Sequence, residues 1–136
     1  METVNLTRCH FGGGGNATVP AGSDVTVRIG WAENNRGRVQ SFLNAQTTTA
    51  DVDGTPVANA SGLWSAISKL NGDLFVTFWS TFVGTLANPG DSLTVRLQVN
   101  LAHVVPAGKD PDTGEHFKEG PGPLLPADFH CTITAT

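Results

Sequence analysis

The stretch that decides the fold is Pro20-Ala21-Gly22-Ser23-Asp24-Val25-Thr26-Val27-Arg28-Ile29-Gly30-Trp31. It opens with turn-forming residues, after which apolar residues alternate strictly with polar or small ones. Val25, Val27, Ile29 and Trp31 fall on one side of this pattern. Successive side chains of a β-strand point to opposite faces of a sheet, so the period of two predicts a strand with one face buried.

The pattern returns farther along the chain. A second turn-rich run, residues 88–92, is followed by apolar residues at 93, 95, 97, 99 and 101, and residues 129–135 alternate in the same way. Further strands are predicted over residues 37–49 and 73–83, with Asp53-Gly54 as a hairpin turn. Apolar residues at helical spacing in 61–70 predict one short helix. We therefore predict an all-β fold: an immunoglobulin-like antiparallel β-sandwich of about seven strands with one short helix.

Length and composition set limits on the class of protein. A chain of 136 residues predicts a single domain over 1–136. The net charge is -4, and the 8 Lys and Arg residues are scattered singly rather than clustered. A phosphate-binding surface needs clustered cations, so we expect no nucleic-acid partner. The apolar stretches are shorter than the roughly 18 residues of a membrane span, so we expect no membrane insertion.

Cys9 lies in a first candidate strand together with Val4 and Leu6, and Cys131 lies in the last predicted strand, 129–135. Terminal strands are often neighbours in sandwiches, so a Cys9–Cys131 disulfide is predicted, and with it an oxidising compartment and a secreted or cell-surface location. Residues 1–4 show no signal-peptide features, so a cytoplasmic assembly stays open as an alternative. Val4 and Leu6 share a parity that excludes Cys9, which predicts a bulge or a change of sheet near Thr7 or Arg8.

Two stretches carry a resemblance to a known family. Pro-Ala-Gly-Ser-Asp-Val-Thr-Val-Arg-Ile (20–29) and Pro-Gly-Asp-Ser-Leu-Thr-Val-Arg-Leu (89–97) resemble the strand-opening patterns of bacterial immunoglobulin-like accessory domains, including adhesion-related ones. The resemblance covers only these stretches. It implies a secreted or surface-displayed spacer, adhesion or binding module, and it brings no active-site motif with it.

Cys9-His10 and His130-Cys131 form the one set of residue types typical of a zinc site. Adjacent residues in a strand point to opposite faces, so each Cys-His pair cannot reach one ion together. A disulfide inside with His10 and His130 outside is the simpler prediction. The two histidines stay weak metal candidates, and we expect no cofactor.

Candidate binding residues come from the tryptophans and from the long Gly- and Pro-rich segment 105–126. Exposed tryptophan faces stack on sugars and anchor protein partners. Alternate carboxylates in the long segment provide part of a calcium loop, although the full loop pattern is absent. Recognition residues of sandwiches commonly lie on such loops. The candidates are Trp64, Trp79, Asp110, Asp112 and Glu115.

No catalytic motif is present: the sequence contains no Gly-x-Ser-x-Gly, His-Glu-x-x-His, Walker or dinucleotide-binding pattern. We therefore expect a non-catalytic binding or spacer module that recognises a protein or glycan partner through loops or a sheet face. The alternatives are a self-assembling subunit of a virion or filament, and a carbohydrate-binding module using the tryptophans. Asn5, Asn16 and Asn59 are possible glycosylation sites, and Gly12–Gly15 is expected to be a flexible connection.

Overall fold

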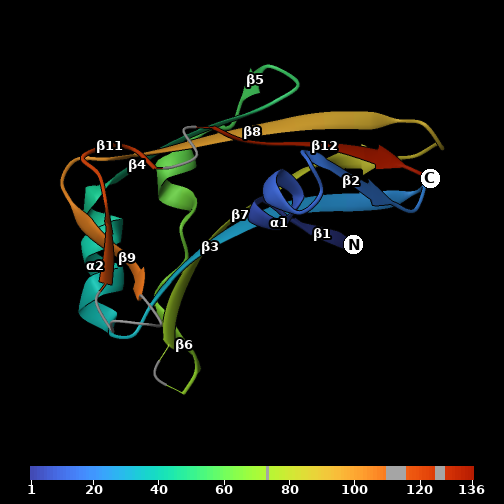
Figure 1. Ribbon diagram of the computed structural model, residues 1–136. Coiled ribbons are helices and arrows are strands. Elements are labelled where there is room, and N and C mark those ends of the chain that lie inside the picture. Colours follow the sequence, from blue (N-terminus) through green and yellow to red (C-terminus); the bar gives the residue numbers. More distant parts are fainter. Residues whose placement is uncertain (73, 110–115, 125–127) are drawn as a thin grey trace.

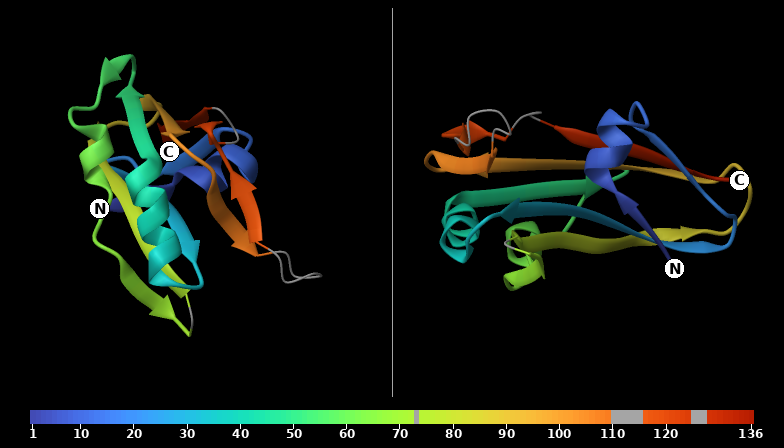
Figure 2. Two further views of the ribbon diagram at one scale, coloured as in Figure 1. Left: turned by 90° about the vertical axis from the view of Figure 1, so that its left-hand side faces the viewer. Right: turned by 60° about the horizontal axis from the view of Figure 1, so that its bottom comes forward.

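Two β-sheets stacked face to face form the body of the protein (Figures 1 and 2). The structure, a computed structural model, describes residues 1–72, 74–109, 116–124 and 128–136. Along the chain, the elements are β1 Glu2–Asn5, α1 Leu6–Phe11, β2 Asn16–Val19, β3 Ser23–Glu33, α2 Arg36–Ala45, β4 Gln46–Val52, β5 Thr55–Pro56, the 3-10 helix η1 Ala60–Leu63, β6 Ser68–Asn71, β7 Leu74–Leu86, β8 Ser92–Leu101, β9 Val105–Lys109, β10 His116–Glu119, β11 Gly122–Pro123 and β12 Phe129–Ala135.

The strands form two main sheets and one hairpin. The four-stranded sheet has the order β1-β3-β7-β6, and the six-stranded sheet has the order β2-β12-β8-β4-β5 with β11 paired to β8. Strands β9 and β10 pair with each other. The predicted all-β sandwich is confirmed, although the described residues form twelve strands, several of them short, rather than about seven.

The core lies between the sheets and is built from the alternating residues of the long strands. In β3, β8 and β12, the apolar side of each alternation is buried, as the period of two predicts. Strand β8 runs antiparallel to β12 and β4, which places Val95 opposite both Cys131 and Val52. Burying these apolar side chains supplies the main favourable term in folding.

The N-terminal segment departs from the predicted antiparallel arrangement. β1 pairs in parallel with β3 in one sheet, and β2 pairs in parallel with β12 in the other. The predicted change of sheet near Thr7 and Arg8 is confirmed, but a helix makes it, not a bulged strand. The side chain of Asn5 caps α1 by accepting a hydrogen bond from the Arg8 N–H at 2.9 Å, and Leu6 and Cys9 turn inward one helical turn apart.

The strand predicted over 37–49 is wrong in its first part, which forms α2. The side chain of Asn35 caps this helix by accepting from the Arg38 N–H at 2.8 Å. Val39 and Phe42 are buried three residues apart, at the spacing of one helix face. The helix closes one end of the sandwich (Figure 1), and the Thr-rich residues after it form β4.

The short helix predicted over 61–70 is also wrong, apart from the single turn of η1. Sheet pairing overrides the helical spacing here. Trp64 forms an isolated antiparallel bridge with Trp79, and the Ser65 N–H donates to the Phe78 carbonyl at 2.8 Å. The chain therefore stays extended beside β7 and enters β6 at Ser68.

The Gly12–Gly15 run forms a tight hydrogen-bonded turn, not a flexible connection. The Gly15 N–H donates to the Cys9 carbonyl at 2.8 Å, and the Gly15 carbonyl accepts from the Thr132 N–H at 2.8 Å. Gly14 and Gly15 have positive φ angles of 62° and 86°, which favour glycine. A β-carbon on Gly13 would collide with the Asn16 carbonyl oxygen.

Candidate functional site

The predicted disulfide joins Cys9 of α1 to Cys131 of β12, with an S–S distance of 2.04 Å. Both residues are buried, at 5% and 0% exposure. The bond therefore links α1, the helix that connects the two sheets, to β12, the last strand along the chain, which lies between β2 and β8 in the six-stranded sheet. It links residues 122 positions apart, so it closes nearly the whole chain into one loop.

His10 and His130 lie together beside the disulfide, with ring centroids 4.9 Å apart. The backbone N–H of His130 donates to Nδ1 of His10 at 3.3 Å, so that nitrogen is already occupied. The His130 ring also lies over Gly15, where an added β-carbon would sit 2.9 Å from Nε2. Within the described residues, no group of three or more His, Cys, Asp or Glu side chains is placed to hold a metal ion.

The two candidate tryptophans pack inside the protein. Trp79 is 0% exposed, and its Nε1 donates to the Ala60 carbonyl at 2.8 Å. This leaves no ring surface for a partner, which contradicts its prediction as an exposed contact residue. Trp64 is half-buried: its Nε1 donates to Thr48 Oγ1 at 2.9 Å, and its ring meets Phe42 edge to face. The remaining candidates, Asp110, Asp112 and Glu115, lie outside the described residues.

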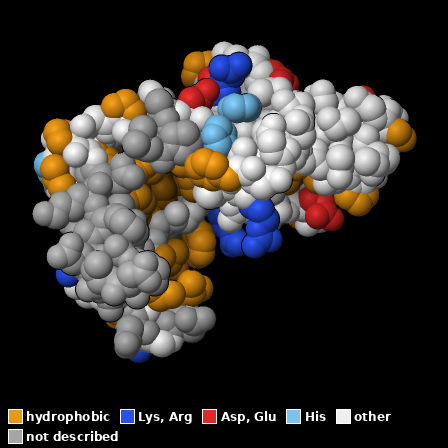
Figure 3. All heavy atoms as spheres, viewed as in Figure 1, with side chains coloured by type: hydrophobic (Ala, Val, Ile, Leu, Met, Phe, Trp, Pro, Cys, Tyr) orange, Lys and Arg blue, Asp and Glu red, His pale blue; other side chains and the backbone are white. Residues whose placement is uncertain are grey.

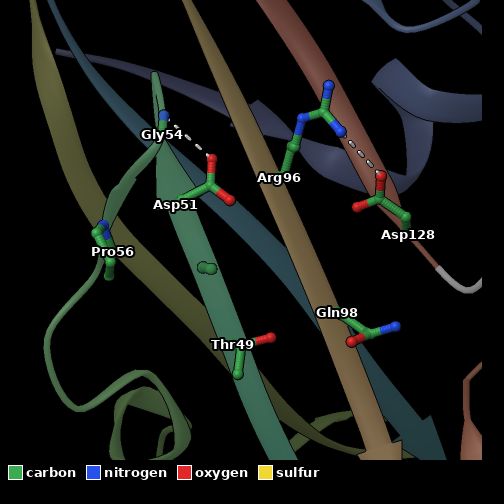
Figure 4. Close-up of a pocket in the computed structure, with 8 residues that line it drawn as sticks. Thr49, Asp51, Gly54, Pro56, Arg96, Gln98 and Asp128 are labelled. Atoms are coloured by element: carbon green, nitrogen blue, oxygen red, sulfur yellow. Dashed lines mark hydrogen bonds and ion pairs between the residues drawn. The ribbon is translucent and has the colours of Figure 1, made fainter.

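A groove lined mainly by polar residues lies instead on the six-stranded sheet, across β4, the β4–β5 hairpin and β8, with Asp128 just before β12 at its side (Figure 4). Its volume is about 510 Å³. Acidic and basic side chains lie side by side over this part of the molecule, at the top of Figure 3. We call it the sheet-face groove and define it by its lining residues, Thr49, Ala50, Asp51, Gly54, Pro56, Arg96, Gln98 and Asp128.

One wall of the groove is the β4–β5 hairpin, whose turn is rigidly held. Asp53 and Gly54 have φ angles of 50° and 83°, as the predicted Asp-Gly turn requires. The Asp51 carboxylate accepts from the Gly54 N–H at 3.3 Å. The Asp53 carboxylate accepts from the Thr94 N–H of β8 at 2.8 Å, which ties the hairpin tip to the neighbouring strand.

Arg96 occupies the middle of the groove. The strand register places it opposite Asp51 on β4 and His130 on β12. Its guanidinium reaches toward Asp128, with Nη1 3.8 Å from the carboxylate (Figure 4). The two side chains are 62% and 46% exposed, so water screens this ion pair and it holds the arginine only weakly. The guanidinium therefore keeps donors free for a ligand.

The groove continues past the hairpin tip. A second hollow of about 520 Å³ is lined by Asp51, Asp53, Gly54, Thr94 and Arg96, and it shares three of these residues with the first. The two hollows therefore adjoin at Asp51, Gly54 and Arg96.

The arrangement provides hydrogen-bond donors and acceptors on rigid strands. The Arg96 guanidinium donates, the carboxylates of Asp51 and Asp128 accept, and the side chains of Gln98 and Thr49 can do both. Such a set can fix the orientation of a polar ligand through several hydrogen bonds at once. The sequence contains the signal for this face, because 94, 96, 98 and 100 are the polar side of the β8 alternation. Nothing in a single strand says which polar side chains of its neighbours will lie beside them.

Among the described residues, no helix combines the length and the apolar character that crossing a bilayer requires. No protein-family model matches the chain, and no curated protein matches its sequence.

Proposed function

We propose that the chain is a non-catalytic binding module of a secreted or surface protein, and that its sheet-face groove binds a glycan. The observation that carries the proposal is the row of donors and acceptors around Arg96, held on β4, β8 and the residue that precedes β12. The Cys9–Cys131 disulfide supports an oxidising location, because such bonds persist mainly in secreted and surface proteins.

The lining of the groove favours a hydroxyl-rich ligand over a protein surface. Protein interfaces typically centre on apolar or aromatic anchors from which charge is depleted. In this groove, the central side chains are Arg96 and Gln98, flanked by Asp51 and Asp128, and none of the lining residues that the structure describes is aromatic. Sugar hydroxyls both donate and accept, so they can satisfy this mixed set of groups.

The rigidity of the groove supports binding without a large ordering cost. Its side chains stand on paired strands of a six-stranded sheet, and hydrogen bonds from Gly54 and Thr94 hold the hairpin wall. Binding to a preorganised surface avoids the entropy loss of ordering a loop.

The experiment is a calorimetric titration of the disulfide-bonded chain with hexasaccharides of glucose, xylose, mannose and N-acetylglucosamine. We expect saturable binding of at least one of them. A hydrogen bond to a charged group is worth about 1.5–3 kcal/mol, so Arg96→Ala should weaken that binding by about tenfold or more.

Arg28→Ala is the matched control for this titration. Arg28 is an exposed arginine on β3, in the other sheet, where its guanidinium lies 4.5 Å from the Phe78 ring centroid. This variant should bind like the wild type. Absence of binding to every hexasaccharide, or an equal loss in both variants, would overturn the proposal.

A further inference from the structure

A third hollow lies elsewhere on the protein, between the edge strands β1 and β2. Its volume is about 470 Å³. We call it the edge cleft. It is lined by β1 residues Thr3, Val4 and Asn5, by Arg8, Cys9, Gly12 and Gly13 of α1 and the turn, and by Asn16 and Ala17 of β2.

The two strands beside the cleft are the outermost strands of their sheets. Within the described residues, β1 pairs only with β3, and β2 pairs only with β12. An edge strand directs alternate N–H and C=O groups away from its one partner. One open edge from each sheet therefore borders the same hollow, which two residues of α1 also line.

On the opposite side of the sandwich, serine residues cover backbone groups of β4 and β7. The Ser61 hydroxyl accepts from the Thr48 N–H at 2.9 Å and donates to the Thr48 carbonyl at 3.2 Å, which caps the edge of β4. On β7, the Ser65 hydroxyl accepts from the Phe78 N–H at 3.0 Å, and the Ser65 backbone N–H donates to the Phe78 carbonyl at 2.8 Å. Exposed edges invite pairing with other chains, and such caps block it. Among the described residues, β1 and β2 have no such side-chain caps along the cleft.

The side chains that line the cleft suit an extended peptide with apolar side chains pointing inward and an acidic group near Arg8. Val4 and Ala17 are half-buried and pack against the core, one from each sheet. An inserted side chain pointing inward would meet this apolar surface. Arg8 is the one charged side chain among the described residues that line the cleft, and it forms no ion pair with another side chain that the structure describes. Arg8 is therefore free to pair with an acid.

The chain direction defines how such a segment would lie. β2 leads through the turn at 20–22 into β3, so these two strands run in opposite directions, and β1 is parallel to β3. β1 thus points toward α1 and β2 points away from it (Figure 1). A segment antiparallel to β2 would run toward α1 and bring its C-terminal end to Arg8.

We propose that the edge cleft binds an extended polypeptide segment of a partner, which adds a strand between β1 and β2 and places an acidic group beside Arg8. β1 and β2 are four residues each, which corresponds to strands of about 13 Å. Main-chain hydrogen bonds to both edges provide the affinity, and the pocket for inward side chains provides the selectivity. This site is separate from the glycan groove, and neither proposal depends on the other.

The test pans a phage-displayed library of random dodecapeptides on the disulfide-bonded chain, with counter-selection against Ala17→Lys, which fills the cleft. Thr18→Lys is the matched control, because Thr18 is exposed on the other face of the same strand. Thr3→Lys, at an exposed cleft residue, serves if Ala17→Lys does not fold. Enriched peptides are synthesised and mapped by hydrogen exchange.

We expect enriched peptides to slow amide exchange in residues 2–5 and 16–19. They should bind the cleft variants about tenfold or more weakly and Thr18→Lys normally, and N-methylation at alternate positions should abolish binding. Arg8→Glu should weaken the peptides that carry an acidic C-terminal end. The proposal would be overturned if no peptide bound the cleft variants more weakly than it binds Thr18→Lys. It would also be overturned if the bound peptides slowed amide exchange only in other elements.

Discussion

Replacing both disulfide cysteines, Cys9→Ala with Cys131→Ala, should produce a large loss of stability with little change in the folded structure. The bond links residues 122 positions apart. For a loop of this length, the chain-entropy relation gives about 5 kcal/mol, because the cross-link restricts the unfolded chain. A domain of this size is typically stable by about 5–15 kcal/mol, so the variant should be marginal at 37 °C.

Urea unfolding at 25 °C, followed by tryptophan fluorescence, measures this loss. With a slope of about 2 kcal/mol per molar urea, the midpoint should fall by about 2.5 M. Removing two buried sulfur atoms adds a packing loss of its own. Wild-type protein in the presence of a reductant keeps the sulfur atoms, so it isolates the effect of the cross-link.

The reduced wild type should therefore lose slightly less stability than the double variant. A drop below about 1 kcal/mol in both would refute the reasoning, because it would mean that the unfolded chain is already restricted without the bond. Mass spectrometry with and without reductant, showing a gain of two protons, confirms that the starting material carries the bond.

Three further variants test local features of the fold by the same urea measurement. Gly14→Ala should lower the free energy of unfolding by about 1–2 kcal/mol, because alanine is strained at the left-handed φ angle of this position. Gly15→Ala should lower it more, because its β-carbon would also collide with the His130 ring. Equal losses of stability in the two variants would contradict that contact. Ser61→Ala should cost about 1–2 kcal/mol and raise light scattering at high concentration, since it uncovers the edge of β4 at Thr48; unchanged scattering would argue against the edge cap. Trp79→Phe should cost about 2 kcal/mol, because the buried Ala60 carbonyl loses its donor; a neutral result would show that this hydrogen bond contributes nothing net.

The sequence alone predicts the strands correctly where one face of the strand is buried and the other is exposed to solvent. The alternations in β3, β8 and β12 predicted their faces correctly, and the positions of Cys9 and Cys131 predicted the disulfide. In these segments the local sequence pattern and the tertiary packing agree, so the period of two predicts which side chains are buried.

Prediction failed where neighbouring segments decided the structure. The spacing of Val39 and Phe42 is helical, but the Thr-rich run that follows favours a strand, so the sequence alone predicts one strand where the structure has α2 followed by β4. The segment around Trp64 has helical spacing too, yet pairing with β7 holds it extended.

The candidate sites failed for a related reason. Trp79 falls on the inward side of a strand with apolar residues at both parities, so the sequence could not say which side would be covered. The sheet-face groove depends on side chains of β4 and β8 brought together by the register and on Asp128 before β12, and the edge cleft depends on strands of two different sheets. Only the assembled sandwich shows either site.

The most direct test of the proposed function is ¹H–¹⁵N NMR of the labelled chain during titration with the same four hexasaccharides. If the groove binds a glycan, saturable shifts should cluster at the amides of residues 49–51, 96–98 and 128, and the amides of β3 and β7 should not shift. Shifts absent from the groove for every sugar, or centred on the four-stranded sheet, would contradict the proposed function.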